Sequence, residues 1–216
     1  YPEYTGTGLT AQLKMDVISD SEEAYRVVAE EFDQQFDIKW LQPLGFNNTY
    51  TLAVTNEVYE QYGVETYSDL AMISENLVFG AEHEFFDRQD GYDGLVEEYS
   101  MQFKDEPKKM NVSLKYQAIG NGDMDVTDAF STDGAIIQYN LKVLIDDMGF
   151  FPPYYAAPII KNTTLEKYPE LEAILNTLGN VIDDTAMTDL NYKVDVEGED
   201  VAKVVGEFLN EKGLLD

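Results

Sequence analysis

The sequence contains no cysteine, which excludes disulfides, thiol catalysis and thiolate metal sites. This absence is compatible with an extracytoplasmic protein that avoids thiol chemistry. The single histidine, His83, leaves no set of imidazole side chains for a metal cluster and argues against a catalytic triad. No apolar run approaches the length that a bilayer-spanning helix needs. Several metal-dependent, thiol-dependent and membrane-spanning classes of protein are therefore disfavoured.

Basic residues are also scarce, because 14 lysines and arginines stand against 42 aspartates and glutamates, for a net charge of -28. Such a charge argues against nucleic acid and against an anionic membrane surface as partners. A cationic or zwitterionic ligand is attracted by the same field. With 216 residues, 44% of them hydrophobic, the chain is long enough for one two-lobed unit or two small domains.

Two aromatic segments organise the chain: LGFNNTYTLAV at residues 44–54 and GFFPPYYAAPII at residues 149–160. Each is punctuated by glycine, asparagine or proline and runs into an apolar stretch with the pattern of a strand. The chain between them has the size of a small domain. We interpret the two segments as crossings between two lobes, with a ligand in the cleft that the lobes form.

Strands that alternate with helices predict an α/β chain. Helices are expected over residues 21–36, 56–62, 92–99, 165–168, 170–178, 183–192 and 200–210, with another starting at 68–70. Strands are expected over residues 38–41, 50–55, 77–81, 112–117, 126–130 and 135–144, with a surface loop at 105–109. Thr7 or Thr10 is the expected N-cap of a first helix, and Asn56 that of the helix at 56–62.

Acidic motifs allow two other interpretations. The segment GNGDMDVTD, residues 120–128, clusters acids after glycine, but it lacks the terminal glutamate and the internal glycine of an EF-hand loop. The acidic pairs at 146–147 and 183–184 suit acid-base chemistry, yet carboxylates are so abundant here that chance pairs are expected. We therefore expect no metal site and no catalytic residue.

Two isolated residues carry open alternatives. Arg88 either binds a ligand carboxylate or anchors Asp87 or Asp90 within its own loop, and the second reading is favoured. His83 is interpreted as a strand-end residue with a carboxylate neighbour.

Aromatic residues at turns give the strongest chemical signal. Tyr4, Tyr50, Phe130 and Tyr154 each lie where the backbone is expected to leave regular structure, which is where binding residues concentrate. A trimethylammonium group has no N–H to donate, so ring faces recognise it by diffuse charge and methyl surface. The alternative is that these rings merely cap a core.

Six segments in order, YPEYTGTG, LGFNNTYTLAV, FGAEHEFFDRQDGY, DVTDAFSTDG, GFFPPYYAAPII and LNYKVDVEG, resemble the substrate-binding proteins of glycine betaine/carnitine/choline (osmoprotectant) ABC importers. The resemblance spans the whole chain. It implies an α/β, two-lobed periplasmic-binding-protein-like fold of type II that closes around a compatible solute outside the membrane and delivers it to a permease.

The resemblance also implies site residues. Tyr4, Tyr50 and Tyr154 match the aromatic cage of the family, and Phe130 matches a cage position where relatives commonly carry tyrosine. Thr7 and Asn48 match positions that contact the polar part of the ligand or tune which ligands are accepted. The expected partners of the chain are a small quaternary ammonium ligand and the permease of an ABC transporter, with no cofactor, no metal and no nucleic acid.

Relative to the family, the chain starts after the first strand and helix, so the first lobe is expected to be incomplete at its N-terminus. Residues 1–45 and 151–216 are then lobe I, and residues 46–150 are lobe II. An incomplete lobe exposes sheet edge and apolar surface, which predicts self-association. The expected location is extracytoplasmic, at the cell surface, with membrane association through a lipid anchor or a permease fusion.

Two further hypotheses stay open for function. The same fold binds other betaines, such as ergothioneine, in closely related domains, and Phe130 makes that shift conceivable. A carboxylate-based hydrolase is a weaker alternative, because no acidic pair has a distinctive spacing. A purely structural scaffold is the third.

Overall fold

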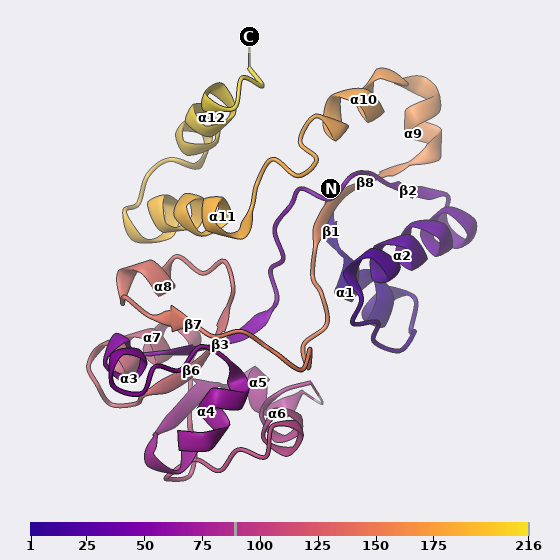
Figure 1. The fold of residues 1–216 in the computed structure, drawn as a ribbon. Helices are drawn as coiled ribbons and strands as arrows, with labels where there is room; N and C mark the ends of the chain where they lie inside the picture. The colour runs from indigo at the N-terminus through magenta and orange to yellow at the C-terminus, as the bar shows by residue number, and fades with distance from the viewer. Residues whose placement is uncertain (89, 216) are drawn as a thin grey trace. The chain divides into compact units, whose positions relative to one another are not determined.

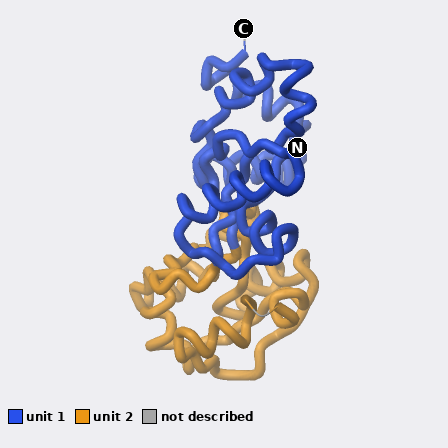
Figure 2. Tube along the Cα trace, turned by 90° about the vertical axis from the view of Figure 1, so that its right-hand side faces the viewer, with its two compact units in different colours: residues 1–49, 152–216 blue, residues 50–151 orange. Residues whose placement is uncertain are grey.

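The computed structural model describes residues 1–88 and 90–215. The chain forms two compact units, unit 1 with Tyr1–Thr49 and Pro152–Asp216, and unit 2 with Tyr50–Phe151 (Figure 2). The divisions fall at residues 49 and 151, whereas the sequence predicted 45 and 150. Asn47 and Thr49 belong to unit 1 because they are hydrogen bonded to residues 152–155.

Unit 1 is built on a small antiparallel sheet in the order β1-β8-β2 (Figure 1). Its strands are β1 (Pro2–Tyr4), β2 (Ile38–Trp40) and β8 (Ala156–Lys161). Its helices are α1 (Thr5–Thr7), α2 (Ser21–Phe36), α9 (Asn162–Lys167), α10 (Glu170–Asn176), α11 (Asp184–Asn191) and α12 (Val201–Glu211), with π-helical turns at Gly8–Gln12 and Tyr192–Val196. The middle strand, β8, follows the second crossing and pairs with β1 at the start of the chain.

The core of unit 1 lies between α2 and this sheet. Val28 and Phe32 of α2 pack with Trp40 of β2 and Ile159 of β8. The indole ring of Trp40 is buried and lies edge-on to Phe32, with ring centroids 5.3 Å apart. The N-cap residue of helix α2 is Asp20, whose carboxylate accepts a hydrogen bond from the backbone N–H of Glu23. Helix α2 is amphipathic, and its apolar side chains face the sheet.

Unit 2 contains a mixed sheet in the order β5-β4-β6-β3-β7 (Figure 1). Its strands are β3 (Tyr50–Val54), β4 (Phe79–Glu82), β5 (Lys108–Met110), β6 (Val126–Phe130) and β7 (Lys142–Val143). Its helices are α3 (Asn56–Tyr62), α4 (Tyr67–Ile73), α5 (His83–Asp87), α6 (Tyr92–Glu98), α7 (Val112–Gly120) and α8 (Ala135–Gln138), with a 3-10 turn at Ser74–Asn76.

Both faces of this sheet are covered. On one face Leu52 and Val54 of β3 pack against side chains of α3 to α6. On the other face Ala53 packs with Tyr116 and Ile119 of α7. Successive side chains of β3 point to opposite faces of the sheet, so this strand contributes to two hydrophobic cores. Tyr50 and Phe130 lie at the ends of the central strands β3 and β6.

The structure corrects several local predictions. Residues 112–117 are helix α7 and not a strand, because Val112 and Leu114, which strand alternation would bury, are half exposed at 50% and 51%. Residues 135–144 form α8 and the short strand β7, separated by Asn140 in a left-handed conformation (φ 49°). The predicted loop at 105–109 overlaps β5 because Lys108–Met110 pairs with β4.

Two predicted helix caps are also wrong. The first helical turn begins at Thr5, and neither Thr7 nor Thr10 caps it; the Thr10 hydroxyl donates instead to the carbonyl of Gly6 at 2.9 Å. The cap of α3 is Thr55 and not Asn56, because the Thr55 side chain accepts the N–H of Val58. The predictions for α2, α6, β3 and β6 are confirmed.

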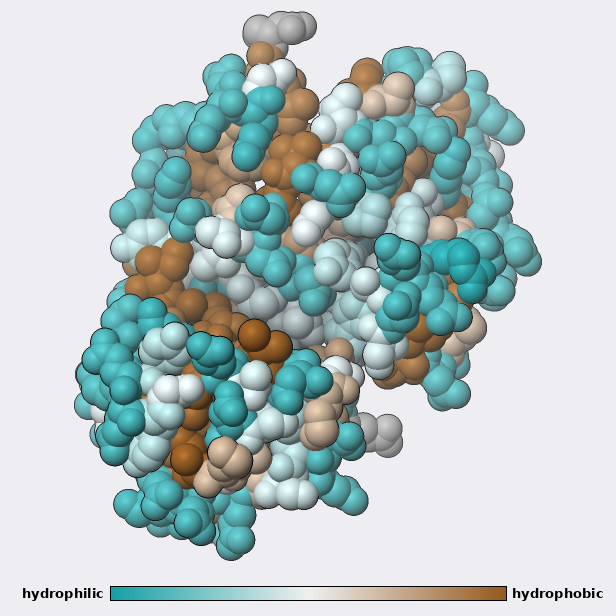
Figure 3. Space-filling model, viewed as in Figure 1, coloured by the Kyte–Doolittle hydropathy of each residue, from teal (hydrophilic) through white to brown (hydrophobic). Residues whose placement is uncertain are grey.

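Polar residues cover most of the visible face of the molecule, and apolar residues appear there in separate patches (Figure 3). Among the described residues, no helix is both long enough and apolar enough to cross a bilayer.

Candidate functional site

Two aromatic rings stand side by side at the end of the central strands of unit 2. Strands β3 and β6 are antiparallel with Tyr50 opposite Phe130, so both side chains leave the sheet together. Their ring centroids are 4.5 Å apart with an interplanar angle of 36°. Phe85 lies 5.3 Å and Phe151 6.1 Å from the Tyr50 ring. The phenol of Tyr50 therefore belongs to an aromatic cluster with a defined orientation.

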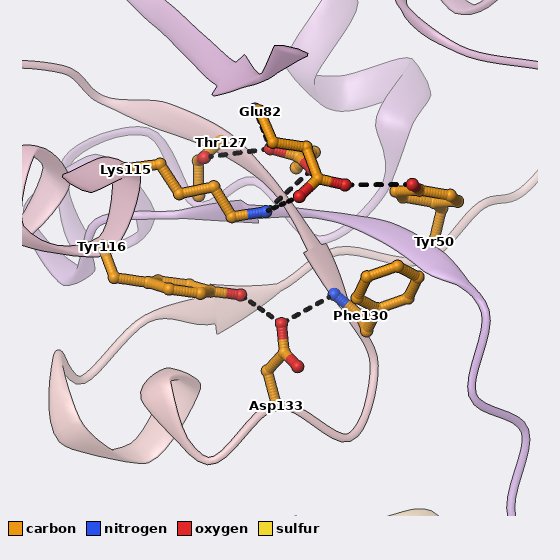
Figure 4. A network of polar contacts seen from close by, with 8 residues as sticks. Tyr50, Glu82, Lys115, Tyr116, Thr127, Phe130 and Asp133 are labelled. Carbon is orange, nitrogen blue, oxygen red and sulfur yellow. Dashed lines mark hydrogen bonds and ion pairs between the residues drawn. The ribbon is translucent and has the colours of Figure 1, made fainter. Parts of the chain in front are cut away.

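A buried group of charged side chains lies next to the hydroxyl of Tyr50 (Figure 4). The Tyr50 hydroxyl donates to Glu82 Oε1 at 3.0 Å, and Glu82 Oε2 lies 4.0 Å from Lys115 Nζ. Lys115 Nζ also lies 2.8 Å from Asp128 Oδ2. Lys115 and Asp128 have no exposed surface, and Glu82 is only 6% exposed. We call Glu82, Lys115 and Asp128 the buried acid cluster.

Burial shifts the pKa of two groups here, Asp128 and Tyr50. Burial raises the pKa of Asp128, and Lys115 opposes that shift. Burial, reinforced by the charge of Glu82 and by the hydrogen bond to it, also raises the pKa of Tyr50. Tyr50 is therefore a neutral phenol at physiological pH, and its hydroxyl donates a hydrogen bond to Glu82.

The position of Phe130 is fixed through its backbone. Its N–H donates to Asp133 Oδ2 at 3.1 Å, and the hydroxyl of Tyr116 donates to the same oxygen (Figure 4). Burial first, and then Asp133, raises the pKa of Tyr116, which keeps this hydroxyl a donor. Helix α7 thus supplies both Lys115 and Tyr116 to the surroundings of the ring pair.

Arg88 lies over the ring of Tyr50. Its guanidinium carbon is 5.2 Å from the centroid of Tyr50, a cation–π distance. The group also forms a bidentate pair with Asp90, with Nε to Oδ1 at 2.8 Å and an NH2 nitrogen to Oδ2 at 2.7 Å. The favoured prediction, that Arg88 anchors an acid of its own loop, is confirmed with Asp90 as that acid.

Hydrogen bonds fix the backbone of Tyr154 in unit 1. The N–H of Tyr154 donates to Asn47 Oδ1 at 2.6 Å, and the N–H of Asn48 donates to the carbonyl of Tyr154 at 3.1 Å. A Cβ on Gly6 would lie 2.7 to 2.8 Å from carbons of the Tyr154 ring, so only glycine permits this close approach. The glycine at position 6 therefore allows the Tyr154 ring to pack directly against the backbone.

The segment that carries Tyr4 is attached to the same strand entry. Tyr4 ends β1 opposite Ala156 of β8, and Thr5 exchanges backbone and side-chain hydrogen bonds with Tyr155. Thr7 lies in the same turn, α1.

The six predicted residues thus fall into two groups. Tyr4, Thr7, Asn48 and Tyr154 lie in unit 1, and Tyr50 and Phe130 lie in unit 2. Their role in one binding site stays a prediction. Sequence analysis missed Glu82, Lys115, Asp128 and Asp133. The position of Glu82 at the end of a buried strand, before a run of polar residues, was the one available signal.

The acidic motifs have structural contacts. Asp146 accepts hydrogen bonds from the Tyr99 hydroxyl and from the backbone N–H groups of Phe150 and Phe151, and Asp147 accepts from Ser68. Asp183 caps α11 by accepting the N–H of Ala186, and Asp184 accepts the N–H of Asn47. Within the described part of the chain, no group of three or more His, Cys, Asp or Glu residues is arranged to hold a metal ion.

Comparisons with known proteins agree over nearly the whole chain. The family described as the substrate binding domain of the ABC-type glycine betaine transport system matches residues 1–211. The ergothioneine transport permease/ergothioneine binding protein EgtU of Helicobacter pylori (strain G27) is 39% identical over 214 residues, which is 99% of this chain and 38% of EgtU. This chain therefore spans well under half the length of that relative.

A second curated relative is the carnitine transport binding protein OpuCC of Listeria monocytogenes. It is 36% identical over 214 residues, which is 99% of this chain and 69% of OpuCC. Among solved structures, one described as a glycine betaine/carnitine/choline ABC transporter superposes with a TM-score of 0.94 at 39% identity, over 100% of this chain and 79% of that chain. Lactococcal OpuAC in complex with glycine betaine, at 13% identity, has a TM-score of 0.55 over 94% of this chain and 79% of its own, and shares the fold.

These solved structures define the class, a type II periplasmic binding protein with two α/β lobes. The predicted fold class is therefore confirmed. The chain belongs to the family of substrate-binding domains of ABC-type glycine betaine transport systems. Substrate-binding proteins of this family are extracytoplasmic.

Proposed function

We propose that this chain binds a quaternary ammonium compatible solute, such as glycine betaine, choline or carnitine, and delivers it to the permease of an ABC importer. Binding takes place outside the cytoplasm and involves no catalysis. The domain stays at the cell surface through a lipid anchor or through attachment to a permease.

The observation that carries this proposal is the ring pair of Tyr50 and Phe130, 4.5 Å apart and backed by the carboxylate of Glu82. Two ring faces next to a negative charge suit a cation without N–H groups, because ring quadrupole and carboxylate both attract it. Choline, carnitine and glycine betaine share such a group, the trimethylammonium.

The proposed rings of the cage are Tyr4, Tyr50, Phe130 and Tyr154, as the resemblance to the family implies. Thr7 and Asn48 contact the polar end of the solute. The close packing of the Tyr154 ring on Gly6 supports this assignment, because a ring fixed before binding costs less entropy to immobilise.

Ergothioneine is the second candidate ligand. It is favoured by the 39% identity to a relative whose name assigns it ergothioneine binding. It is also a trimethylammonium betaine, so the same cage serves both candidates, and the remainder of the molecule decides between them.

Calorimetric titration of the purified chain with choline, carnitine, glycine betaine and ergothioneine tests the proposal. Binding of at least one of the four with a one-to-one stoichiometry is expected. A chain that retains its fold by circular dichroism and binds none of them contradicts the proposed function.

Removing one cage ring provides a sharper test. Tyr50→Ala or Tyr154→Ala should weaken binding by more than about tenfold, because each change removes a cation–π partner and admits water. A leucine at either position keeps apolar bulk and serves as the matched control. Affinity that is unchanged in both alanine variants would exclude the cage.

A further inference from the structure

The buried acid cluster is unusual for a protein interior because its charges do not balance. Glu82 and Asp128 contribute two carboxylates, whereas Lys115 contributes one ammonium group, 2.8 Å from Asp128 and 4.0 Å from Glu82. All three side chains are at least nine-tenths buried. A buried charge is costly unless an opposite charge compensates it.

The shorter distance shows which carboxylate Lys115 neutralises. Asp128 Oδ2 receives the ammonium at 2.8 Å, and Asp128 Oδ1 accepts the backbone N–H of Glu82 at 3.2 Å and the Thr127 hydroxyl at 3.4 Å. Glu82 lies farther from the Lys115 ammonium than Asp128 does, and its nearer partner is the neutral Tyr50 hydroxyl at 3.0 Å. The uncompensated charge of the cluster therefore resides on Glu82.

The other charged groups near Tyr50 do not remove this excess. The guanidinium of Arg88, over the Tyr50 ring, is paired with the carboxylate of Asp90, so the two charges cancel. Glu84 adds a further negative charge on exposed surface. Asp133, which holds the backbone of Phe130, adds another on the side of Tyr116.

We propose that Glu82 is a specificity-determining residue, which acts through Tyr50 and supplies the negative charge that the ligand's quaternary ammonium compensates. The inference rests on the proposed function and deepens it. Glu82 does not contact the ligand. It fixes the phenol by a hydrogen bond, and its charge is transmitted through a ring in a water-poor environment, where electrostatic interactions are strong.

This assignment separates two contributions to binding that a cage alone does not distinguish. Ring faces and methyl groups attract any body of the right shape, charged or neutral. A buried carboxylate next to the ring, in contrast, attracts only a ligand with a positively charged group. Glu82 should therefore control the preference for a charged ligand over a neutral ligand of the same shape.

The test compares choline and glycine betaine, which both carry a quaternary ammonium group, with their tert-butyl analogues, in which carbon replaces the ammonium nitrogen. The choline analogue is neutral, whereas the glycine betaine analogue keeps its carboxylate and is an anion. Choline and glycine betaine, each with its analogue, are titrated calorimetrically, the weak ligands by competition. Glu82→Gln keeps an oxygen that accepts the Tyr50 hydrogen bond but removes the charge. Its affinity for choline and glycine betaine should fall about tenfold or more, because one charge within roughly 10 Å at an effective dielectric constant near 20 contributes at least that much. Its affinity for the neutral choline analogue should stay within about twofold of wild type, and its affinity for the anionic analogue of glycine betaine should not fall.

Two further variants isolate the charge of Glu82. Glu98→Gln removes an exposed carboxylate at the end of α6 and should leave the preference for cations unchanged. Tyr50→Phe removes the hydroxyl but keeps both the ring and the charge of Glu82, so the preference for the cation should survive. A folded Tyr50→Phe variant that loses the preference would show that the hydrogen bond, and not the charge, is responsible, and would overturn the inference even if Glu82→Gln failed to fold.

The thermal midpoint of the Glu82→Gln variant tests whether the role of Glu82 is only structural. A purely structural role predicts a midpoint lower than that of wild type. Because the change removes the uncompensated charge, the midpoint should equal or exceed that of wild type. A lower midpoint with an unchanged ratio of affinities would overturn the inference. So would a wild-type protein that prefers the cation in neither pair of ligands, whereas the proposed function fails only if none of the four solutes binds.

Discussion

Gly6→Ala is expected to weaken ligand binding without any change to a side chain of the proposed cage. The added Cβ would lie 2.7 Å from Cε1 of Tyr154 and 2.8 Å from two further ring carbons. Non-bonded carbons normally approach to about 3.5 to 4.0 Å, so the ring has to move by roughly 1 Å. The backbone of Tyr154 is held by Asn47 and Asn48, so the ring moves by rotation of its side chain.

The size of the effect follows from the contact that is lost. A ring that no longer faces the ammonium forfeits a cation–π contribution of about 0.5 to 2 kcal/mol. That corresponds to a roughly 2- to 30-fold weaker affinity. Calorimetric titration of the tightest of the four solutes measures it, with the thermal midpoint recorded in parallel.

Two other glycines in unit 1 provide matched controls. Gly206→Ala in α12 places a Cβ in open space, so affinity should not change and the helix should gain about 0.5 to 1 kcal/mol. Gly8→Ala brings a Cβ to 2.9 Å from Trp40, which disturbs the core without contact to Tyr154. If Gly6→Ala bound the solute with wild-type affinity, the proposed role of the Tyr154 ring would be refuted.

Two further variants test unit 2. Lys115→Met should destabilise the protein by about 3 to 5 kcal/mol in urea unfolding at neutral pH, because it leaves Asp128 buried without its counter-ion. Folding raises the pKa of the Asp128 carboxyl group, so the folded state gains stability as the pH falls through that raised pKa. The loss of unfolding free energy in Lys115→Met relative to wild type should therefore be smaller in acid. An equal loss at neutral and acidic pH would contradict this reasoning. Phe130→Tyr keeps the ring quadrupole and should bind the solute within about threefold of wild type in the same titration, whereas a much larger loss would show that the pocket has no space for a hydroxyl.

Much of the fold could be predicted from local signals. Helix α2 combines an N-terminal acid, two glutamates in its first turn and an apolar stripe, and its predicted bounds agree with the structure. Strand β3 was predictable from the alternation of Tyr50, Leu52 and Val54 with their neighbours. In α7 the same kind of reasoning failed, because Val112 and Leu114 alternate with polar residues but are not on a buried face.

The candidate site was predictable in part for a related reason. Tyr50 and Phe130 adjoin turns in the sequence, and that position alone indicated side chains at strand ends. The buried acid cluster was not accessible in this way. Glu82, Lys115 and Asp128 meet only because β4 and β6 are neighbours in the sheet and α7 crosses it, and this order is a long-range property.

Trp40 has a practical consequence for measuring stability. It is the one tryptophan of the chain, and it is buried in the core of unit 1. Its fluorescence therefore reports the melting of that unit alone, whereas far-ultraviolet circular dichroism registers helices of both units. Denaturation curves from the two signals would coincide if the units unfold together and would separate if they unfold one after the other, so a natural optical probe divides the stability of the protein between its two halves.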